Sequence, residues 1–348
     1  MNKHGGYQGE NKEMLDFSVN INPLGIPAGI REKLIAGIDE LVKYPEITGV
    51  SAIGKIADDL AVLPENIILG NGAIELIYLF ARSIGPGKAL IVQPTFNEYE
   101  RALKLYGWEV VHHVLAAEDN FTLNPEALAA VIKNEKPQAV FLCNPNNPTG
   151  RVYGSEFIRE MLEHSAPEIS WFLDESFMDF SDESGSLSLV KEAKQRVFIL
   201  KSLTKFYALP GLRIGYGVGM APIIAKMEGF KEPWTINALG LIAATAVYDE
   251  KDYAEQTKTY IKAERQRVFE ALNQIESLKV YPSGADFHLC RLLQGTVVEL
   301  QIALEKEGMS LRTCEDFIGL DHTYFRIAIK KVADNNKLLT FLKNWRNE

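Results

Sequence analysis

Short apolar runs alternate with amphipathic stretches between about residues 65 and 220. Each run has the length of a buried strand and is followed by polar or turn-forming residues. The runs lie at residues 67–69, 89–92, 140–142, 171–173 and 197–200. In the stretch after the first run, apolar side chains repeat with the spacing of one helix face, at Ile74, Ile77, Tyr78 and Ala81. Strands that alternate with helices predict an α/β fold, a mostly parallel sheet with helices on both faces.

The pattern changes after about residue 250. A long charged helix is predicted from Lys251 to about Ile275, and the region behind it mixes helices with fewer strands. We therefore predict a large domain at residues 44–250 and a smaller α+β domain at residues 251–348. Residues 1–43 are expected to form an N-terminal arm that packs on the small domain or crosses to a partner subunit.

Composition and charge argue against several classes of function. The chain has 348 residues, of which 47% are hydrophobic and 24% charged, as is typical of a soluble globular protein. Its formal net charge of -9 disfavours a nucleic-acid partner, because the phosphate backbone repels an acidic protein. No run reaches the roughly 18 apolar residues of a membrane span, and the polar N-terminus does not resemble a signal peptide. We expect neither a nucleic-acid partner nor a membrane association.

Cysteine and histidine positions favour neither a disulfide framework nor a metal site. Cys143, Cys290 and Cys314 are scattered, odd in number and without a C-x-x-C pair. His112 and His113 are adjacent, and neighbouring residues on a strand point to opposite faces. We therefore expect no bound metal and a reducing, cytoplasmic location.

Lys205 is the first candidate for chemistry, because it follows the apolar run that ends at Leu200. In open α/β sheets, ligands bind beyond the carboxyl ends of the strands. Leu203 and Phe206 flank the lysine, and an apolar environment favours the neutral amine that a Schiff base requires. The alternative is a strand-to-loop segment with an incidental charge.

Asp174 closes the apolar run Trp171–Leu173 and is expected to be largely buried. A buried carboxylate needs a cationic partner or strong hydrogen bonds. A protonated pyridine nitrogen is such a partner, whereas the alternative is a structural Asp that caps the next turn.

Further polar and aromatic residues follow other strands. Ser202 and Arg213 flank Lys205 in sequence and could bind a phosphate, and the segment 70–72 offers free backbone N–H groups before a helix. Asn147 lies in an Asn-Pro-Thr-Gly turn, where its amide could hold a phenolate oxygen. Phe96 could stack on a planar ring. An ordinary turn and a core aromatic are the alternatives for these last two residues.

Taken in order, the Gly-x-Gly, the aromatic residue, the NPTG turn, the aspartate, the Ser-x-x-Lys and the arginine resemble the fold-type-I pyridoxal-phosphate (PLP) enzymes. This group is the aspartate-aminotransferase superfamily, and the resemblance spans essentially the whole chain. It implies that Lys205 carries PLP as a Schiff base and that Asp174 pairs with the pyridine nitrogen. It also implies cofactor contacts from Tyr44, Gly72, Ala73, Phe96, Asn147, Ser202 and Arg213. Because the family's equivalent of Tyr44 reaches a neighbouring subunit, we expect a homodimer with shared active sites.

The N-terminal segment narrows the resemblance. Residues 4–6 and 16–25 resemble the start of L-threonine-O-3-phosphate decarboxylases of cobalamin synthesis, and Phe177 stands where transaminases usually have Tyr. The implied reaction converts L-threonine O-3-phosphate to (R)-1-amino-2-propanol phosphate. L-serine O-phosphate, which would give ethanolamine phosphate, is a further or alternative substrate. By resemblance, the phosphorylated amino acid contacts His4, Gly5, Asn20, Asn147, Arg312 and Arg326.

The sequence also allows structural roles for the predicted substrate contacts and other functions for the protein. His4 could be a disordered terminal residue, and Arg312 and Arg326 could form salt bridges inside the small domain. Histidinol-phosphate aminotransferase is the alternative enzyme. A non-catalytic PLP-sensing module is a remote alternative, since the chain offers no room for a DNA-binding domain before Tyr44.

Overall fold

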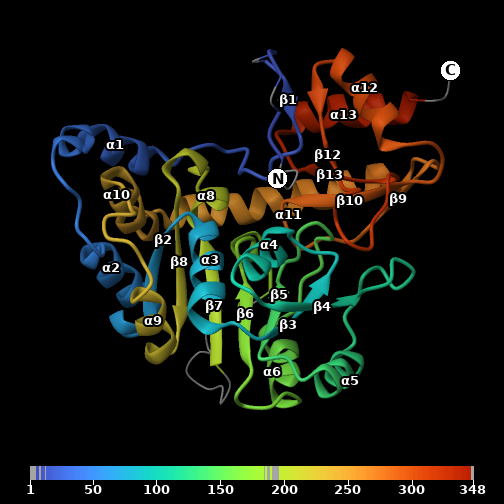
Figure 1. Ribbon diagram of the computed structural model, residues 1–348. Coiled ribbons are helices and arrows are strands. Elements are labelled where there is room, and N and C mark those ends of the chain that lie inside the picture. The colour runs from blue at the N-terminus through green and yellow to red at the C-terminus, as the bar shows by residue number, and fades with distance from the viewer. Residues whose placement is uncertain are drawn as a thin grey trace.

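The computed structural model describes residues 5–7, 9–11, 13–183, 185, 189 and 196–345. Its largest element is a seven-stranded sheet with the order β2-β8-β7-β6-β5-β3-β4 (Figure 1). The strands are β2 (Ile67–Asn71), β3 (Lys88–Gln93), β4 (Glu109–Val114), β5 (Ala139–Cys143), β6 (Ser170–Asp174), β7 (Arg196–Ser202) and β8 (Ile214–Gly219). Strand β8 is antiparallel to β2 and β7, whereas the pairs β3–β4, β3–β5, β5–β6 and β6–β7 are parallel. The predicted mostly parallel α/β sheet is confirmed.

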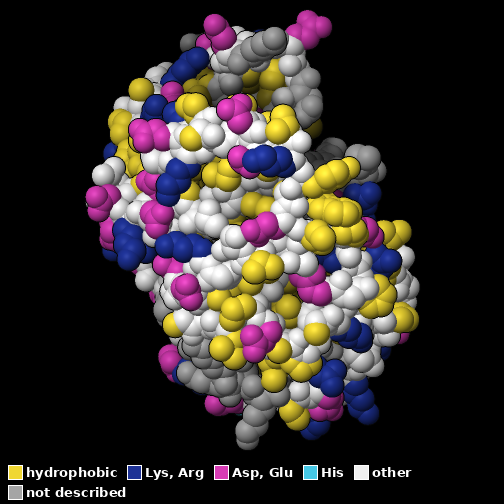
Figure 2. All heavy atoms as spheres, turned by 90° about the vertical axis from the view of Figure 1, so that its left-hand side faces the viewer, with side chains coloured by type: hydrophobic (Ala, Val, Ile, Leu, Met, Phe, Trp, Pro, Cys, Tyr) yellow, Lys and Arg dark blue, Asp and Glu magenta, His cyan; other side chains and the backbone are white. Residues whose placement is uncertain are grey.

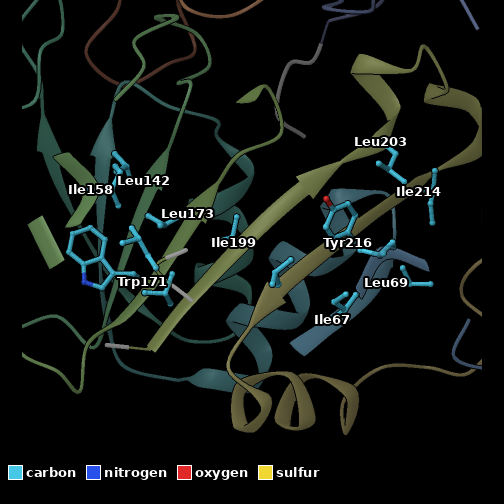
Figure 3. Packing of buried hydrophobic residues seen from close by; sticks show 14 of the residues in the cluster. Ile67, Leu69, Leu142, Ile158, Trp171, Leu173, Ile199, Leu203, Ile214 and Tyr216 are labelled. Carbon is cyan, nitrogen blue, oxygen red and sulfur yellow. The ribbon is translucent and has the colours of Figure 1, made fainter. Parts of the chain in front are cut away.

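Alternate side chains of each central strand pack into two different cores. Phe141 and Phe172 pack with helices α3, α4 and α9, whereas Leu142 and Leu173 pack with α2, α5, α6 and α10. Figure 3 shows the second core, in which Leu142, Leu173 and Ile199 come from neighbouring strands. Burial on both faces explains why these strands read as unbroken apolar runs. The helices are α2 (Val50–Leu60), α3 (Ala73–Ile84), α4 (Glu98–Leu105), α5 (Pro125–Glu135), α6 (Ser155–Glu163), α8 (Leu203–Phe206), α9 (Ala221–Glu228) and α10 (Ala238–Ala246).

A second, smaller sheet lies beyond the carboxyl ends of β5, β6 and β7 (Figure 1). It is antiparallel with the order β12-β13-β10-β9. Its strands are β9 (Leu278–Val280), β10 (Phe287–Leu292), β12 (Arg312–Thr313) and β13 (Tyr324–Ala328), and its helices are α11 (Lys251–Asn273), α12 (Val297–Lys306) and α13 (Val332–Asn344). The long helix α11 runs between the two sheets and contacts β9, β10 and α13 (Figure 1).

The N-terminal segment is part of this second unit. Strand β1 (Leu15–Asp16) pairs in parallel with β11 (Met309–Ser310), and the N–H of Phe17 donates to the carbonyl of Ser310 at 2.7 Å. The carbonyl of Phe17 accepts from the N–H of Ala328 at 2.9 Å. The residues that follow β1 are therefore held beside β13, where they form a wall of the site described below.

The chain then crosses to the large sheet through α1 (Ala28–Ala36), which packs against α10. Short 3-10 helices occur at η1 (Ile38–Val42), η2 (Pro64–Asn66), η3 (Met178–Phe180), η4 (Pro210–Leu212) and η5 (Val247–Asp249). Within the described residues, none of the helices combines the length and the apolar character that crossing a bilayer requires.

Candidate active site

Two adjoining cavities lie between the carboxyl ends of β5, β6 and β7 and the smaller sheet. The smaller cavity has a volume of about 180 Å³ and the larger about 510 Å³. Both are lined by Phe96, Asn147, Phe177 and Lys205. The smaller one is otherwise lined by Gly5, Ser18, Val19, Asn20, Ile21, Asn97, Arg312, Phe317 and Arg326. The larger one is otherwise lined by Ala73, Ile74, Ile77, Tyr78, Glu98, Tyr99, Arg101, Cys143, Asp174, Ser176, Thr204 and Arg213.

Lys205 lies where the two cavities meet. It belongs to the one-turn helix α8, which follows β7 directly, and its Nζ donates to Oγ of Ser202 at 3.1 Å. Burial lowers the pKa of Lys205, and the charge of Arg213 acts in the same direction while that of Asp174 opposes it. A lowered pKa increases the fraction of neutral amine, which is the nucleophile in Schiff-base formation.

Asp174 is buried at the end of β6 and has both carboxylate oxygens fixed. Its Oδ1 accepts from the N–H of Ser176 at 2.9 Å, and its Oδ2 accepts from the hydroxyl of Tyr99 at 2.5 Å. Burial raises the pKa of Tyr99 well above its usual value, so this hydroxyl remains a donor at neutral pH. The arrangement holds a carboxylate in one orientation at the wall of the larger cavity.

The partnership of Tyr99 with Asp174 was not among the sequence predictions. Tyr99 lies on α4, three positions after Phe96, and its ring also packs edge-to-face on Phe96 with centroids 5.7 Å apart. An aromatic residue three positions after another on a helix is expected to pack in the core, so the pattern gave Tyr99 no functional role. The only sequence signal for a second role was the polar tip that a buried Tyr must satisfy.

The start of α3 combines a helix N-terminus with Arg213, but the prediction that segment 70–72 offers free N–H groups is wrong, because the N–H of Asn71 donates to Oε2 of Glu75 at 2.7 Å and that of Gly72 is also used. Gly72 precedes this helix with φ of 72° and ψ of 160°, and its N–H donates to the carbonyl of Arg213 at 2.8 Å. A Cβ at Gly72 would collide with the guanidinium of Arg213, so glycine permits the arginine to approach the helix N-terminus. Ala73 and Arg213 line the larger cavity, while Ser202 is buried beside Lys205. Helix N-termini and arginines both favour anions.

Arg326 joins the N-terminal segment to the large sheet. Its guanidinium donates to Oδ1 of Asn147 and, at 2.8 Å, to the carbonyl of Ser18. Its Nε has no hydrogen-bond partner among the described residues. Burial lowers the pKa of Arg326 to about 10, which leaves it protonated at neutral pH.

Arg312 is also buried and lines the smaller cavity from strand β12. It forms an ion pair with Asp316 at 2.8 Å. Arg312 therefore combines an ion pair within the small unit with a place in the cavity wall, whereas Arg326 donates to an amide and a carbonyl. Arg312, Arg326 and Lys205 line a cavity whose described lining includes neither Asp nor Glu, which favours an anionic ligand.

Gly5 and Asn20 line the smaller cavity, whereas His4, the third predicted substrate contact of the N-terminal segment, lies outside the described residues. Oδ1 of Asn20 is buried and has no hydrogen-bond partner in the described part of the chain. Tyr44 lines neither cavity. It is 85% exposed, and its ring lies 5.4 Å from that of Trp234 on the surface. Within a single chain, Tyr44 therefore does not contribute to the site.

Residues 12–342 match the family model described as aminotransferase class I and II. The chain belongs to this family. It is 35% identical to the threonine-phosphate decarboxylase of Salmonella typhimurium over 95% of this chain and 91% of that protein. Two solved structures are also similar. The histidinol-phosphate aminotransferase of Clostridium acetobutylicum superposes with a TM-score of 0.89 at 35% identity, covering 96% of this chain and 99% of that one. The L-threonine-O-3-phosphate decarboxylase of Porphyromonas gingivalis superposes with a TM-score of 0.87 at 28% identity, covering 96% of this chain and 100% of that one.

The predicted fold type and PLP cofactor are confirmed by these matches, and the chain is a PLP-dependent enzyme. The residues present suit the cofactor. Lys205 supplies an amine with a lowered pKa, and Asp174 supplies an oriented carboxylate. The N-terminus of α3, at Ala73, and the guanidinium of Arg213 lie together and favour a phosphate group; we call this pair the anion cradle. Phe96 offers a ring beside them. The role of each residue remains a prediction from the resemblance.

Proposed function

We propose that the enzyme decarboxylates L-threonine O-3-phosphate to (R)-1-amino-2-propanol phosphate, the linker of the cobalamin nucleotide loop. The observation that carries this proposal is the small cavity beside Lys205, where two buried arginines converge. A phosphorylated amino acid has two anionic groups, one for each arginine. The proposal also agrees with the 35% identity to a threonine-phosphate decarboxylase.

Phe177 supports decarboxylation over transamination. It lines both cavities, and its ring centroid lies 5.8 Å from Nζ of Lys205. A phenylalanine has no hydroxyl with which to donate to a bound oxygen. A cofactor held here would therefore lack the tyrosine hydrogen bond that transaminases usually provide.

The positions of these residues suggest a separate role for each in the proposed reaction. Arg312 and Arg326 bind the two anionic groups and fix rotation about the bond between the substrate nitrogen and the α-carbon. That rotation decides whether the carboxylate or the hydrogen leaves the α-carbon. PLP, when bound, supplies an electron sink, and Asp174 holds its pyridine nitrogen protonated. Lys205 or a bound water then delivers a proton to the α-carbon in place of the lost CO2.

L-serine O-phosphate is the closest competing substrate. It differs from threonine phosphate by one methyl group, which discriminates by only about 1–3 kcal/mol in an apolar pocket. Val19, Ile21 and Phe317 provide the apolar part of the smaller cavity. We expect both substrates to react, with threonine phosphate the faster.

Histidinol-phosphate aminotransferase is the second candidate, because one such enzyme superposes with a TM-score of 0.89 at 35% identity. Histidinol phosphate carries an imidazole ring and only one anionic group. The cavity of about 180 Å³ and its two arginines suit it less well than a small dianionic amino acid.

The test is release of labelled CO2 from carboxyl-labelled L-threonine phosphate and L-serine phosphate by purified protein with PLP. We expect CO2 release from threonine phosphate without any amino acceptor. Amino transfer from histidinol phosphate to 2-oxoglutarate, with no CO2 release, would instead establish the aminotransferase.

We further propose a homodimer in which Tyr44 of each chain completes the site of the other. Tyr44 is highly exposed and lines neither cavity of its own chain. The same segment exposes Val42 and Val50, at 86% and 68%. Figure 2 looks onto this side of the molecule and shows hydrophobic side chains gathered there. An apolar surface of this kind favours contact with another subunit.

A further inference from the structure

Asp286 is a fully buried carboxyl group that lies outside the site described above. It immediately precedes β10, and it is 0% exposed. Neither of its carboxylate oxygens has a hydrogen-bond partner from another described residue. An ionised carboxylate in such a place is costly unless nearby positive charge offsets it.

Four cations from different parts of the fold act electrostatically on Asp286. They are Arg326 on β13, Lys330 just after it, Lys205 in α8 and Arg265 in α11. Each acts on the carboxyl group through its electrostatic field, and none donates a hydrogen bond to it.

Other titratable groups also act on these four cations or lie beside Asp286. Asp174 acts on Lys205, Asp16 acts on Arg326 and Lys330, Asp334 acts on Lys330, and Asp182 acts on Arg265. Burial lowers the pKa of the neighbouring His288 to about 4, so this imidazole stays neutral near pH 7.

Two of the four cations, Lys205 and Arg326, line the smaller cavity. A pair of aromatic rings connects them to the backbone beside Asp286. The guanidinium carbon of Arg326 lies 5.2 Å from the ring centroid of Phe287, and this ring packs edge-to-face on Phe177 at 5.2 Å. Nζ of Lys205 lies 5.8 Å from the centroid of Phe177. The carboxyl group is therefore close enough to influence the cavity but is not one of its lining residues.

Burial raises the pKa of Asp286 to about 7, while a hydrogen bond from its own backbone and the charges of Arg326, Lys330 and Lys205 act to lower it. The group therefore exchanges a proton in the range where an enzyme works. Each such exchange changes the net charge behind the cavity by one unit.

We propose that Asp286 is a positioning residue whose charge offsets Arg326 and Lys205, so that its ionisation sets how tightly the cavity binds an anionic substrate. When Asp286 is ionised, it reduces the positive potential of the cavity and weakens anion binding. When it takes up a proton, the potential rises and binding strengthens. For one unit of charge behind the cavity wall, in a medium of effective dielectric constant about 20, we expect an effect on the order of tenfold in affinity.

This inference rests on the smaller cavity being the anion site of the proposed function. A suitable probe is 3-sulfopropanoate, which carries a carboxylate and a sulfonate but no amine. Both of its charges are constant between pH 6 and pH 8.5, unlike those of a phosphate, whose second pKa is about 6. Its dissociation constant is measured by calorimetry on the PLP-loaded enzyme across that range.

The informative variant is Asp286→Asn, which removes the charge but keeps the shape of the side chain. We expect the wild type to bind the probe about tenfold more tightly at pH 6 than at pH 8.5. Asp286→Asn should bind tightly at pH 8.5 as well, with a much smaller difference between the two pH values than the wild type shows. The absorbance titration of the bound cofactor should also shift to lower pH in the variant, because protonated Lys205 loses a stabilising negative charge.

Asp182→Asn is the matched control. Asp182 also lies near Arg265, but its side chain is 55% exposed, so its charge is screened by solvent. It should behave as the wild type. If Asp286→Asn and Asp182→Asn show the same binding curve and the same absorbance titration, Asp286 has no influence on the cavity and the proposal is wrong.

Failure of the wild type to bind the probe would also overturn it. The CO2 assay decides separately whether the proposed reaction occurs.

Discussion

At the scale of single residues, Tyr99 determines how Asp174 is presented to the larger cavity. The two residues are 75 positions apart in sequence, yet the phenol donates to the carboxylate at 2.5 Å in a buried place. The second carboxylate oxygen is held by the backbone of Ser176. Without the phenol, Asp174 would keep one hydrogen bond and gain freedom to rotate.

We predict that Tyr99→Phe weakens PLP binding by about tenfold. A hydrogen bond to a charged group contributes about 1.5–3 kcal/mol, and part of that is lost with the orientation of Asp174. The measurement is an absorbance titration of the apoenzyme with PLP. Because the pKa of Tyr99 is raised well above its usual value, the loss should not vary between pH 6 and pH 9.

Tyr153→Phe is the control for this prediction. The hydroxyl of Tyr153 accepts from the N–H of Leu123 at 2.7 Å, and Tyr153 lines neither cavity. It should lower stability slightly and leave PLP affinity unchanged. Equal losses of PLP affinity in the two variants would mean that Tyr99 acts only through general stability.

At the scale of elements, the junction between β2 and α3 depends on a backbone that only glycine adopts easily. Gly72 has a positive φ of 72°, and the guanidinium of Arg213 occupies the space where a Cβ would be. The junction brings the helix N-terminus and the arginine to the same wall of the larger cavity. A side chain at this position would separate the two parts of the anion cradle.

We predict that Gly72→Ala lowers PLP affinity by at least about tenfold and destabilises the fold by roughly 1–3 kcal/mol, the range for a residue forced into a sparsely populated conformation. PLP titration and thermal unfolding measure the two effects. Gly54→Ala in the middle of α2 is the matched control, because nothing lies within 4 Å of its added Cβ. It should stabilise the fold by about 0.5–1 kcal/mol and leave PLP binding intact. Similar behaviour of the two variants would contradict a special role for Gly72.

At the scale of the whole molecule, the site within one chain lacks the predicted cofactor contact from Tyr44, because Tyr44 lines neither cavity of its own chain. The exposed apolar segment around Val42 provides a surface on which a second copy could bring that tyrosine to the cofactor (Figure 2). Dimerisation and activity would then be coupled, because separated chains would lack one phosphate contact.

We predict that Val42→Asp yields monomers with reduced PLP affinity, since a buried unpaired charge opposes association. Light scattering during size-exclusion chromatography gives the mass of the assembly. Val332→Asp, at another exposed valine at the start of α13, should leave the assembly unchanged. A monomeric wild type, or a dimeric Val42→Asp with full PLP affinity, would rule out the shared site.

The sequence alone determined the α/β class, the PLP cofactor and the candidates Lys205 and Asp174. The class and the two candidates are local signals, because a buried parallel strand is apolar at consecutive positions and its carboxyl end carries the functional residue. The cofactor followed from the resemblance of the ordered motifs to a known family. The matches to known proteins confirm the class and the cofactor.

Only the tertiary structure decided which distant residues act together. Arg326 contacts Asn147 and Ser18 across separations of 179 and 308 residues, and Asp286 lies among cations from several elements. No periodicity or motif encodes such contacts, because they depend on how the smaller sheet packs over the larger one. Whether a buried Tyr or Asp is a core residue or part of a site is set by the groups that folding places beside it.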